Sequence, residues 1–185
     1  MNTTTTTNTS NLSVEILKQL AFMQHEGESF FILDGKAYEG EREDIYMDYE
    51  QRNENDYKQT FEDYCAENLT EVEDFDNDDY LVLTDEEADE KAKEYITDSL
   101  WAFNPSFLAS MTEFDEEIFQ AIADNGKCES NNDVIYNTIQ KTCGINDFVE
   151  AAVQADGRGH FMSSYDGNEN EETVHGETFY IYRLN

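Results

Sequence analysis

Apolar residues recur at three- and four-residue spacing through the middle of the chain, which predicts a block of helices. Thr84 and Glu87 have the spacing of a capping box, so a helix is expected to begin there. One face of this helix is predicted to carry Ala88, Ala92, Tyr95, Ile96, Ser99 and Phe103. Similar apolar spacing recurs up to Met111, from Thr112 to Asn125 and on both sides of Gly144. Residues 84–155 are therefore predicted to be helical.

The segments on either side of this block predict strands. A helix from Val14 is expected to stop at Gly27, and "SFFILDGKAYEG" then has an Asp34-Gly35 turn between apolar runs, as in a β-hairpin. A second hairpin is predicted at the C-terminus, where residues 159–164 and 177–184 alternate polar with apolar around the loop 165–176. The predicted fold class is α+β: a central helical block packed with short β-hairpins near the N-terminal third and at the C-terminus.

Residues 39–80 differ in composition, since Asp, Glu, Asn and Tyr dominate them. Tyr57, Phe61 and Tyr64 have the spacing of one face of a helix, and an acidic loop is the alternative. Residues 1–12 are of low complexity and polar, and they are predicted to be a disordered tail. They lack the basic and apolar regions of a signal peptide, so neither a signal peptide nor an anchor is expected there. Residues 13–185 are then expected to form a single acidic domain.

The charge of the chain is far outside the usual range. It has 43 Asp and Glu against 11 Lys and Arg, a formal net charge of −32, whereas small soluble domains typically have a net charge of roughly 2 to 8 in magnitude. This sign argues against direct binding to nucleic acid or to an anionic membrane, because Lys and Arg make phosphate contacts. A basic partner is the expected complement. Adaptation to high salt is the competing explanation, and it should spread the carboxylates evenly.

The predicted partner-binding surface is acidic. Glu86, Glu90, Glu94 and Asp98 lie four residues apart on the predicted helix, so their carboxylates form a row with a spacing near that of phosphates. The acidic run continues on both sides of this helix. The further residues predicted to bind a partner are Asp74, Asp76, Asp78, Asp79, Glu113, Glu116 and Glu117.

No segment predicts an enzyme or a cofactor site. Cys65, Cys128 and Cys143 lack CxxC spacing and are interpreted as reduced thiols, and no nucleotide-binding or hydrolase motif is present. The loop Asp166–Glu177 resembles a calcium loop but has Glu171 where the turn requires glycine. A second candidate for metal binding or acid–base chemistry is the pair His160 and His175 with Asp156 or Asp166. The alternative is that both are ordinary surface or hairpin-packing histidines. Arg158 is expected to pair with an acid or cap a helix; a functional role is the alternative.

Two stretches carry a resemblance to known proteins: "YLVLTDEEADEKAKEYITDSLWAFNPSFLA" (80–109) and "AAVQADGRGHFMSSYDGNE" (151–169). Here the chain resembles small acidic proteins of bacteriophages and mobile elements that lack an assigned activity. In charge it is also similar to phage DNA mimics, which block restriction or CRISPR enzymes by occupying their nucleic-acid groove. The resemblance implies a non-enzymatic inhibitor in the host cytoplasm.

Three functions follow as hypotheses. The first is a nucleic-acid mimic that binds the basic groove of a host nuclease or CRISPR effector. The second is a small metal-binding or regulatory module that uses the C-terminal hairpin. The third is an inhibitor that binds through an aromatic patch. A homodimer would lengthen the charged surface in the first case.

Overall fold

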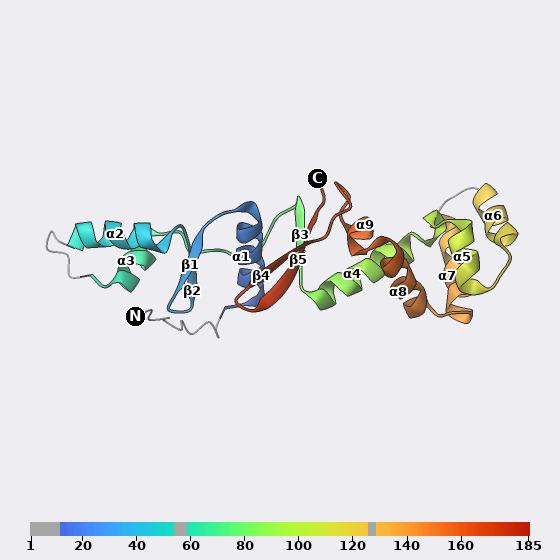
Figure 1. Cartoon of the computed structure of the whole chain (residues 1–185), viewed down its shortest axis with the longest axis horizontal. Helices are drawn as coiled ribbons and strands as arrows, with labels where there is room; N and C mark the ends of the chain where they lie inside the picture. The colour runs from blue at the N-terminus through green and yellow to red at the C-terminus, as the bar shows by residue number, and fades with distance from the viewer. Residues whose placement is uncertain (1–11, 54–58, 126–128) are drawn as a thin grey trace. The chain divides into compact units, whose positions relative to one another are not determined.

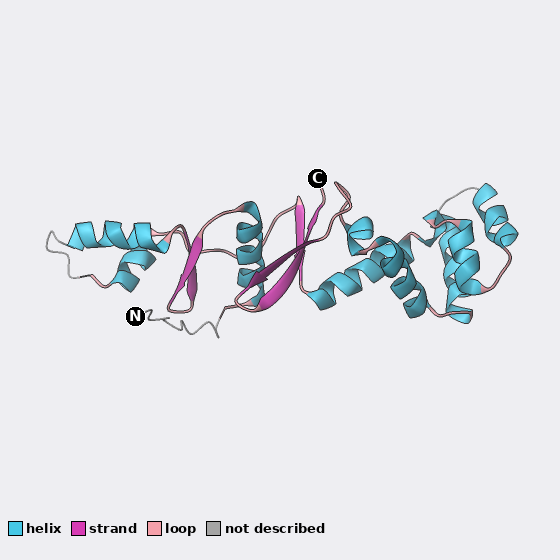
Figure 2. Ribbon diagram, in the orientation of Figure 1, coloured by secondary structure: helices cyan, strands magenta, loops and turns pink. Residues whose placement is uncertain are grey.

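A computed structural model of the chain describes residues 12–53, 59–125 and 129–185. These residues divide into two compact units, and Figure 1 labels their helices and strands. Unit 1 comprises the chain up to Thr84 together with Asn170–Ile181, and unit 2 comprises Asp85–Glu169 together with Tyr182–Asn185. Figure 2 shows helices together with small antiparallel sheets, so the predicted α+β class is confirmed. The single domain stays a prediction. Of the predicted tail, residues 1–11 lie outside the described residues.

Unit 1 contains a two-stranded sheet, β1-β2, and a three-stranded sheet in the order β3-β5-β4. Its elements are α1 (Val14–Glu26), β1 (Phe30–Leu33), β2 (Lys36–Glu39), α2 (Arg42–Asn53), α3 (Phe61–Asn68), β3 (Tyr80–Leu83), β4 (Asn170–Val174) and most of β5 (Glu177–Arg183). The predicted Asp34-Gly35 turn joins β1 to β2, and both residues have positive φ, at 52° and 79°. This is the turn geometry that matches the twist of a two-residue hairpin.

Two hydrophobic clusters hold unit 1 together. In the first, Leu17, Leu20 and Ala21 of α1 pack with buried residues of β3, β4 and β5, among them Phe179 and Ile181. The second cluster is mostly aromatic and consists of Phe31, Tyr38, Phe61, Tyr64 and Cys65. Helix α3 therefore packs its aromatic side inward, as its spacing predicted, while Tyr57 lies outside the described residues.

Unit 2 is mainly helical and confirms the predicted block. Its elements are α4 (Asp85–Asp98), the 3₁₀ turn η1 (Leu100–Ala102), α5 (Pro105–Thr112), α6 (Glu116–Asp124), η2 (Glu129–Asn131), α7 (Asn132–Lys141), α8 (Ile145–Asp156) and α9 (Arg158–Met162). Its core includes Ile96, Leu100, Leu108, Phe119, Ile139 and Phe148. Helix α4 begins directly after Thr84 and buries Ala88, Ala92 and Ile96, as predicted. Tyr95 was wrongly assigned to this buried face, because it is 39% exposed and lies beside Lys91. Ser99 and Phe103 were wrongly assigned to this helix, which ends at Asp98, and they flank the turn η1.

The C-terminal hairpin exists, but its first strand is not where the sequence predicted it. Residues 159–164 were expected to be a strand, whereas Arg158–Met162 form the short helix α9. The strand that pairs with β5 is β4, with Asn170 opposite Ile181 and Val174 opposite Glu177. Six alternating residues fit one helical turn as well as a strand, so the pattern alone could not decide. Segment 42–53, for which the sequence predicted no element, forms the helix α2.

Gly159 is the residue that fits α9 against the following loop. A Cβ atom at this position would lie 2.6 Å from the backbone oxygen of Gly167 and 2.6 Å from the carbonyl carbon of Asn168. Backbone atoms cannot rotate away from such a contact as a side chain can. The loop can therefore pass over α9 only because residue 159 has no side chain.

The substitution Gly159→Ala should reverse the usual sign of a glycine-to-alanine change in a helix. Such a change ordinarily stabilises by about 0.5–1 kcal/mol, but here the overpacking should lower the free energy of unfolding by about 2 kcal/mol. Urea unfolding followed by the fluorescence of Trp101, which packs against the core of unit 2, measures this. His160→Ala, at an exposed position of the same helix, is the control and should change little. Greater stability of Gly159→Ala would contradict the close approach.

Candidate functional site

The four carboxylates predicted on α4 are all exposed and share one side of the helix, which we call the α4 stripe: Glu86, Glu90, Glu94 and Asp98. The buried residues Ala88, Ala92 and Ile96 lie on the other side, so the core fixes the direction of the stripe. Successive members rise by about 6 Å, which gives a row about 18 Å long. Within the described chain only Glu94 of the four forms an ion pair, with Lys91 Nζ at 2.6 Å from its Oε2.

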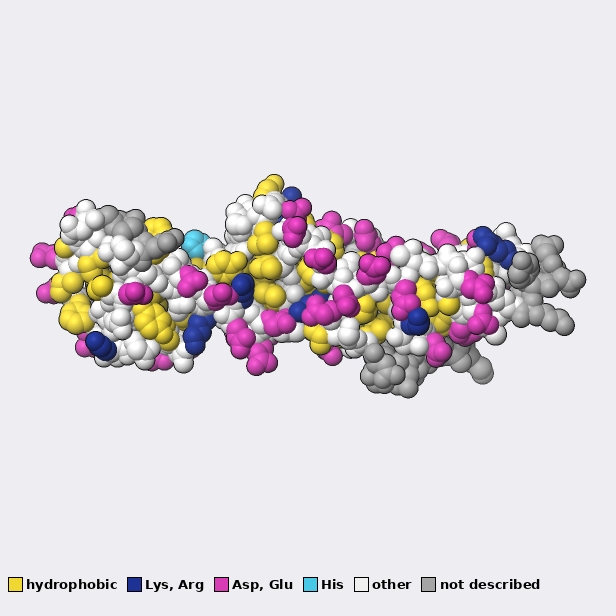
Figure 3. Space-filling model, turned by 180° about the vertical axis from the view of Figure 1, so that it is seen from behind, with side chains coloured by type: hydrophobic (Ala, Val, Ile, Leu, Met, Phe, Trp, Pro, Cys, Tyr) yellow, Lys and Arg dark blue, Asp and Glu magenta, His cyan; other side chains and the backbone are white. Residues whose placement is uncertain are grey.

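The other predicted partner-binding residues are exposed but lie on other elements. Asp74, Asp76, Asp78 and Asp79 lie in the loop between α3 and β3, in unit 1. Glu113 follows α5, while Glu116 and Glu117 form the first turn of α6, in unit 2. Figure 3 shows Asp and Glu side chains over much of the face in view, with hydrophobic side chains between them. Of the acids predicted to bind a partner, the four of the α4 stripe are therefore the set that one helix holds in a single row.

Beside the stripe, Arg158 gathers three carboxylates from two parts of unit 2. Its Nη1 donates to Asp85 Oδ1 at 2.7 Å and to Asp89 Oδ1 at 2.9 Å, both on α4. Its Nε and Nη2 donate to the two oxygens of Glu169, at 2.9 and 3.2 Å. Tyr182 Oη also donates to Glu169, at 2.5 Å. We call these residues the Arg158 cluster.

Burial and charge act in opposite directions on Arg158. Its side chain is only 11% exposed, and this burial lowers its pKa, but the hydrogen bonds that it donates to Glu169 and Asp85 outweigh the burial and raise the pKa above the ordinary value. The guanidinium is thus permanently charged, and its single positive charge reduces the repulsion among Asp85, Asp89 and Glu169. The sequence predicted that Arg158 pairs with an acid, and this is confirmed, but spacing alone did not identify which acids.

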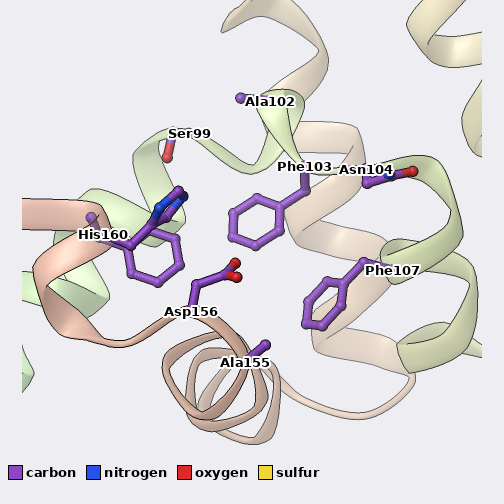
Figure 4. Close-up of a pocket in the computed structure, with 9 residues that line it drawn as sticks. Ser99, Ala102, Phe103, Asn104, Phe107, Ala155, Asp156 and His160 are labelled. Atoms are coloured by element: carbon purple, nitrogen blue, oxygen red, sulfur yellow. The ribbon is translucent and has the colours of Figure 1, made fainter. Parts of the chain in front are cut away.

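A pocket of about 460 Å³ opens in unit 2 between the end of α8, α9 and the segment from η1 to α5 (Figure 4). Half-buried rings of Phe103, Phe107 and Phe161 line it, together with Ser99, Ala102, Asn104, Ala155, Asp156 and His160. In Figure 4 the carboxylate of Asp156 points toward the ring of Phe103. The Ser99 hydroxyl donates to the carbonyl of Tyr95 at 2.6 Å, so it already has an acceptor in the protein.

The predicted metal candidates lie on separate elements. His160 belongs to α9, and His175 lies in the β4–β5 turn. Residues 170–174 of the calcium-like loop pair with β5 as a strand, so Asp166–Glu177 is not an EF-hand loop. Asp166 instead accepts hydrogen bonds from the backbone of Asn168 and the hydroxyl of Ser163, which lower its pKa. No group of three or more His, Cys, Asp or Glu suited to a metal occurs in the part of the chain that is described.

The cysteines and the helices add little to the candidate chemistry. Cys65 is buried and Cys143 half-buried, both are free, and burial raises the pKa of the Cys65 thiol. Cys128 lies outside the described residues.

Among the described helices, none combines the length and apolar character that a bilayer crossing requires.

Removing the cation of the Arg158 cluster should destabilise unit 2. Arg158→Gln leaves three carboxylates facing one another, and since Asp85 and Asp89 are about 70% exposed, we expect a loss of about 2 kcal/mol rather than the 3–5 of a fully buried pair. Urea unfolding followed by Trp101 fluorescence measures the loss. Lys91→Gln, which removes one exposed ion pair on α4, should cost about 0.5 kcal/mol or less. Equal effects of the two changes would refute the special role of Arg158.

Asp156 should make the opposite contribution to stability. It is the last residue of α8, where the partial negative charge of the helix end disfavours an acid. Asp156→Asn should therefore raise the free energy of unfolding by about 0.3–1 kcal/mol, as measured by the same urea unfolding. A clear loss of stability would mean that the carboxylate has a structural role.

The two candidate features of unit 2 are thus a row of exposed acids on α4 and an aromatic pocket with a carboxylate. Comparison of the chain with known protein families, with curated proteins and with solved structures found no match.

Proposed function

We propose that the protein is a nucleic-acid-mimicking inhibitor that binds the basic groove of a DNA- or RNA-binding defence protein of the restriction or CRISPR type. The observation that carries the proposal is the α4 stripe, four exposed carboxylates held in a row by a helix whose other side is buried. Three of them lack an ion pair among the described residues, so they are available to a partner's Lys and Arg.

The mechanism is electrostatic. A groove that binds nucleic acid positions Arg and Lys side chains against a row of phosphates, and carboxylates about 6 Å apart on a helix satisfy the same side chains. Helix formation has already fixed the row, so binding need not order it. Like charges at this spacing cost only a few tenths of a kcal/mol each, and a basic partner removes that repulsion on binding.

An apolar contact is the second candidate. Phe114 is 47% exposed between α5 and α6, Ile118 on α6 is 47% exposed and Val134 on α7 is 56% exposed. Large apolar side chains at such exposure are typical of protein-binding surfaces when they form a contiguous patch. Binding through them would depend little on ionic strength, which separates this candidate from the mimic.

The test is capture of host proteins on the immobilised full chain at low salt, followed by elution with duplex DNA or with increasing salt. If the mimic mechanism holds, the retained proteins bind nucleic acid, and both duplex DNA and salt displace them. The variant E86Q/E90Q/E94Q/D98N should weaken binding of a retained protein by at least about tenfold, since each charged hydrogen bond contributes about 1.5–3 kcal/mol.

A second variant separates the position of the charges from their number. D124N/D133N/D147N/E150Q removes the same number of carboxylates from other helices of unit 2, and it should bind nearly as well as the original chain. Equal weakening by both variants would mean that only net charge matters. Binding that resists salt and duplex DNA would rule out the mimic and favour the apolar candidate.

A further inference from the structure

The pocket in unit 2 has walls suited to a flat cation. The rings of Phe103 and Phe107 lie 5.7 Å apart at an interplanar angle of 28°, and those of Phe103 and Phe161 lie 6.1 Å apart at 19°. The ring of Phe103 is thus roughly stacked with each of its two neighbours, and all three rings are half-buried on the pocket wall. The face of an aromatic ring carries the negative part of its quadrupole, which attracts a cation placed over it.

The charged group in the pocket is Asp156. Its side chain is exposed and points toward Phe103 (Figure 4), and within the described residues no ion pair or hydrogen bond neutralises it. It also stands at the C-terminal end of α8, where the helix itself disfavours a negative charge. The helix end therefore disfavours this exposed carboxylate, and a cation bound in the pocket would offset that effect.

We propose that this pocket binds the guanidinium group of an arginine side chain supplied by a partner protein. A guanidinium is planar, so it can stack on Phe103 while its edge donates two hydrogen bonds to the Asp156 carboxylate. An ammonium group lacks this flat face and fork of donors. Arginine fits both surfaces of the pocket at once.

The position of the pocket indicates a protein as the source of the arginine. Ser99 lines the pocket and directly follows Asp98, the last carboxylate of the α4 stripe. A basic protein that lies along the stripe would therefore bring its side chains to the pocket as well. The choice of a protein partner rests on the proposed function, whereas the preference for guanidinium rests on the pocket alone.

The test needs no knowledge of the partner. The full chain, labelled with ¹⁵N, is titrated with the peptide acetyl-Gly-Arg-Gly-amide, and backbone amide shifts are followed by NMR. Arginine should produce saturable shifts at residues 99–107 and 155–161. Matched peptides contain citrulline, which has the shape of arginine without its charge, or lysine, and both should bind at least several-fold more weakly. Equal binding of either one overturns the proposal, as does the absence of saturable shifts with arginine.

Variants locate the binding site. Asp156→Asn should weaken arginine binding about tenfold, as expected for loss of a charged hydrogen bond, and Ala155→Leu should block the pocket while keeping its charge. Glu150→Gln removes an exposed carboxylate from the same helix, away from this pocket, and should leave binding unchanged. Affinity unaltered by Asp156→Asn would place the ligand elsewhere and overturn the proposal. Affinity unaltered by Ala155→Leu, in protein whose spectrum shows the native fold, would do the same.

The same titration distinguishes this inference from the proposed function. The variant E86Q/E90Q/E94Q/D98N should still bind the arginine peptide within about twofold, because the pocket residues are unchanged. Shifts confined to α4 that vanish in this variant would assign the binding to the stripe and overturn the pocket proposal while leaving the mimic intact. Arginine binding in the pocket, together with salt-resistant capture of partners, would support the pocket proposal and exclude the mimic mechanism.

Discussion

The Arg158 guanidinium is the interaction on which the arrangement of unit 2 depends. It joins α9 to Asp85 and Asp89 on α4 and to Glu169 in the loop before β4. These three carboxylates would otherwise repel one another in a chain with a net charge of −32. Gly159, the next residue, allows the same loop to pass against α9 without a steric clash. Arg158 thus reduces the repulsion among these acids and Gly159 permits close backbone packing, so two adjacent residues hold the loop and both helices in place.

Much of the fold could be read from local sequence patterns because the signals were themselves local. The Asp34-Gly35 turn fixed the first hairpin, and the apolar repeat fixed the buried face of α4, since both depend on residues within one or two turns of each other. The strand assigned to residues 159–164 failed for the opposite reason. Its conformation depends on the loop at 167–169, which packs on Gly159, and no periodicity in six residues reveals that contact.

The two parts of the candidate site differ in the same way. The α4 stripe follows from a four-residue spacing, so the sequence alone located it. The Arg158 cluster joins residues that are 69 and 73 positions apart, and the pocket combines Phe103 and Phe107 with residues of α8 and α9. Such groups come together only through tertiary packing. In the sequence "ADGRGHF" (155–161), Arg158 could be recognised as a rare cation between two glycines. The acids that pair with it could not be identified from the sequence.

The acids of unit 2 fall into two electrostatic classes, and this division bears on why the chain is so acidic. Asp85, Asp89 and Glu169 share the single positive charge of Arg158, whereas Glu86, Glu90 and Asp98 form no ion pair within the described chain. Asp156 is uncompensated as well, at a helix end that disfavours it. Adaptation to salt would be served by acids anywhere on the surface. On α4, Asp85 and Asp89 share the charge of Arg158, whereas Glu86, Glu90 and Asp98 of the stripe have no ion-pair partner within the described chain, a division that an even spread of acids does not predict.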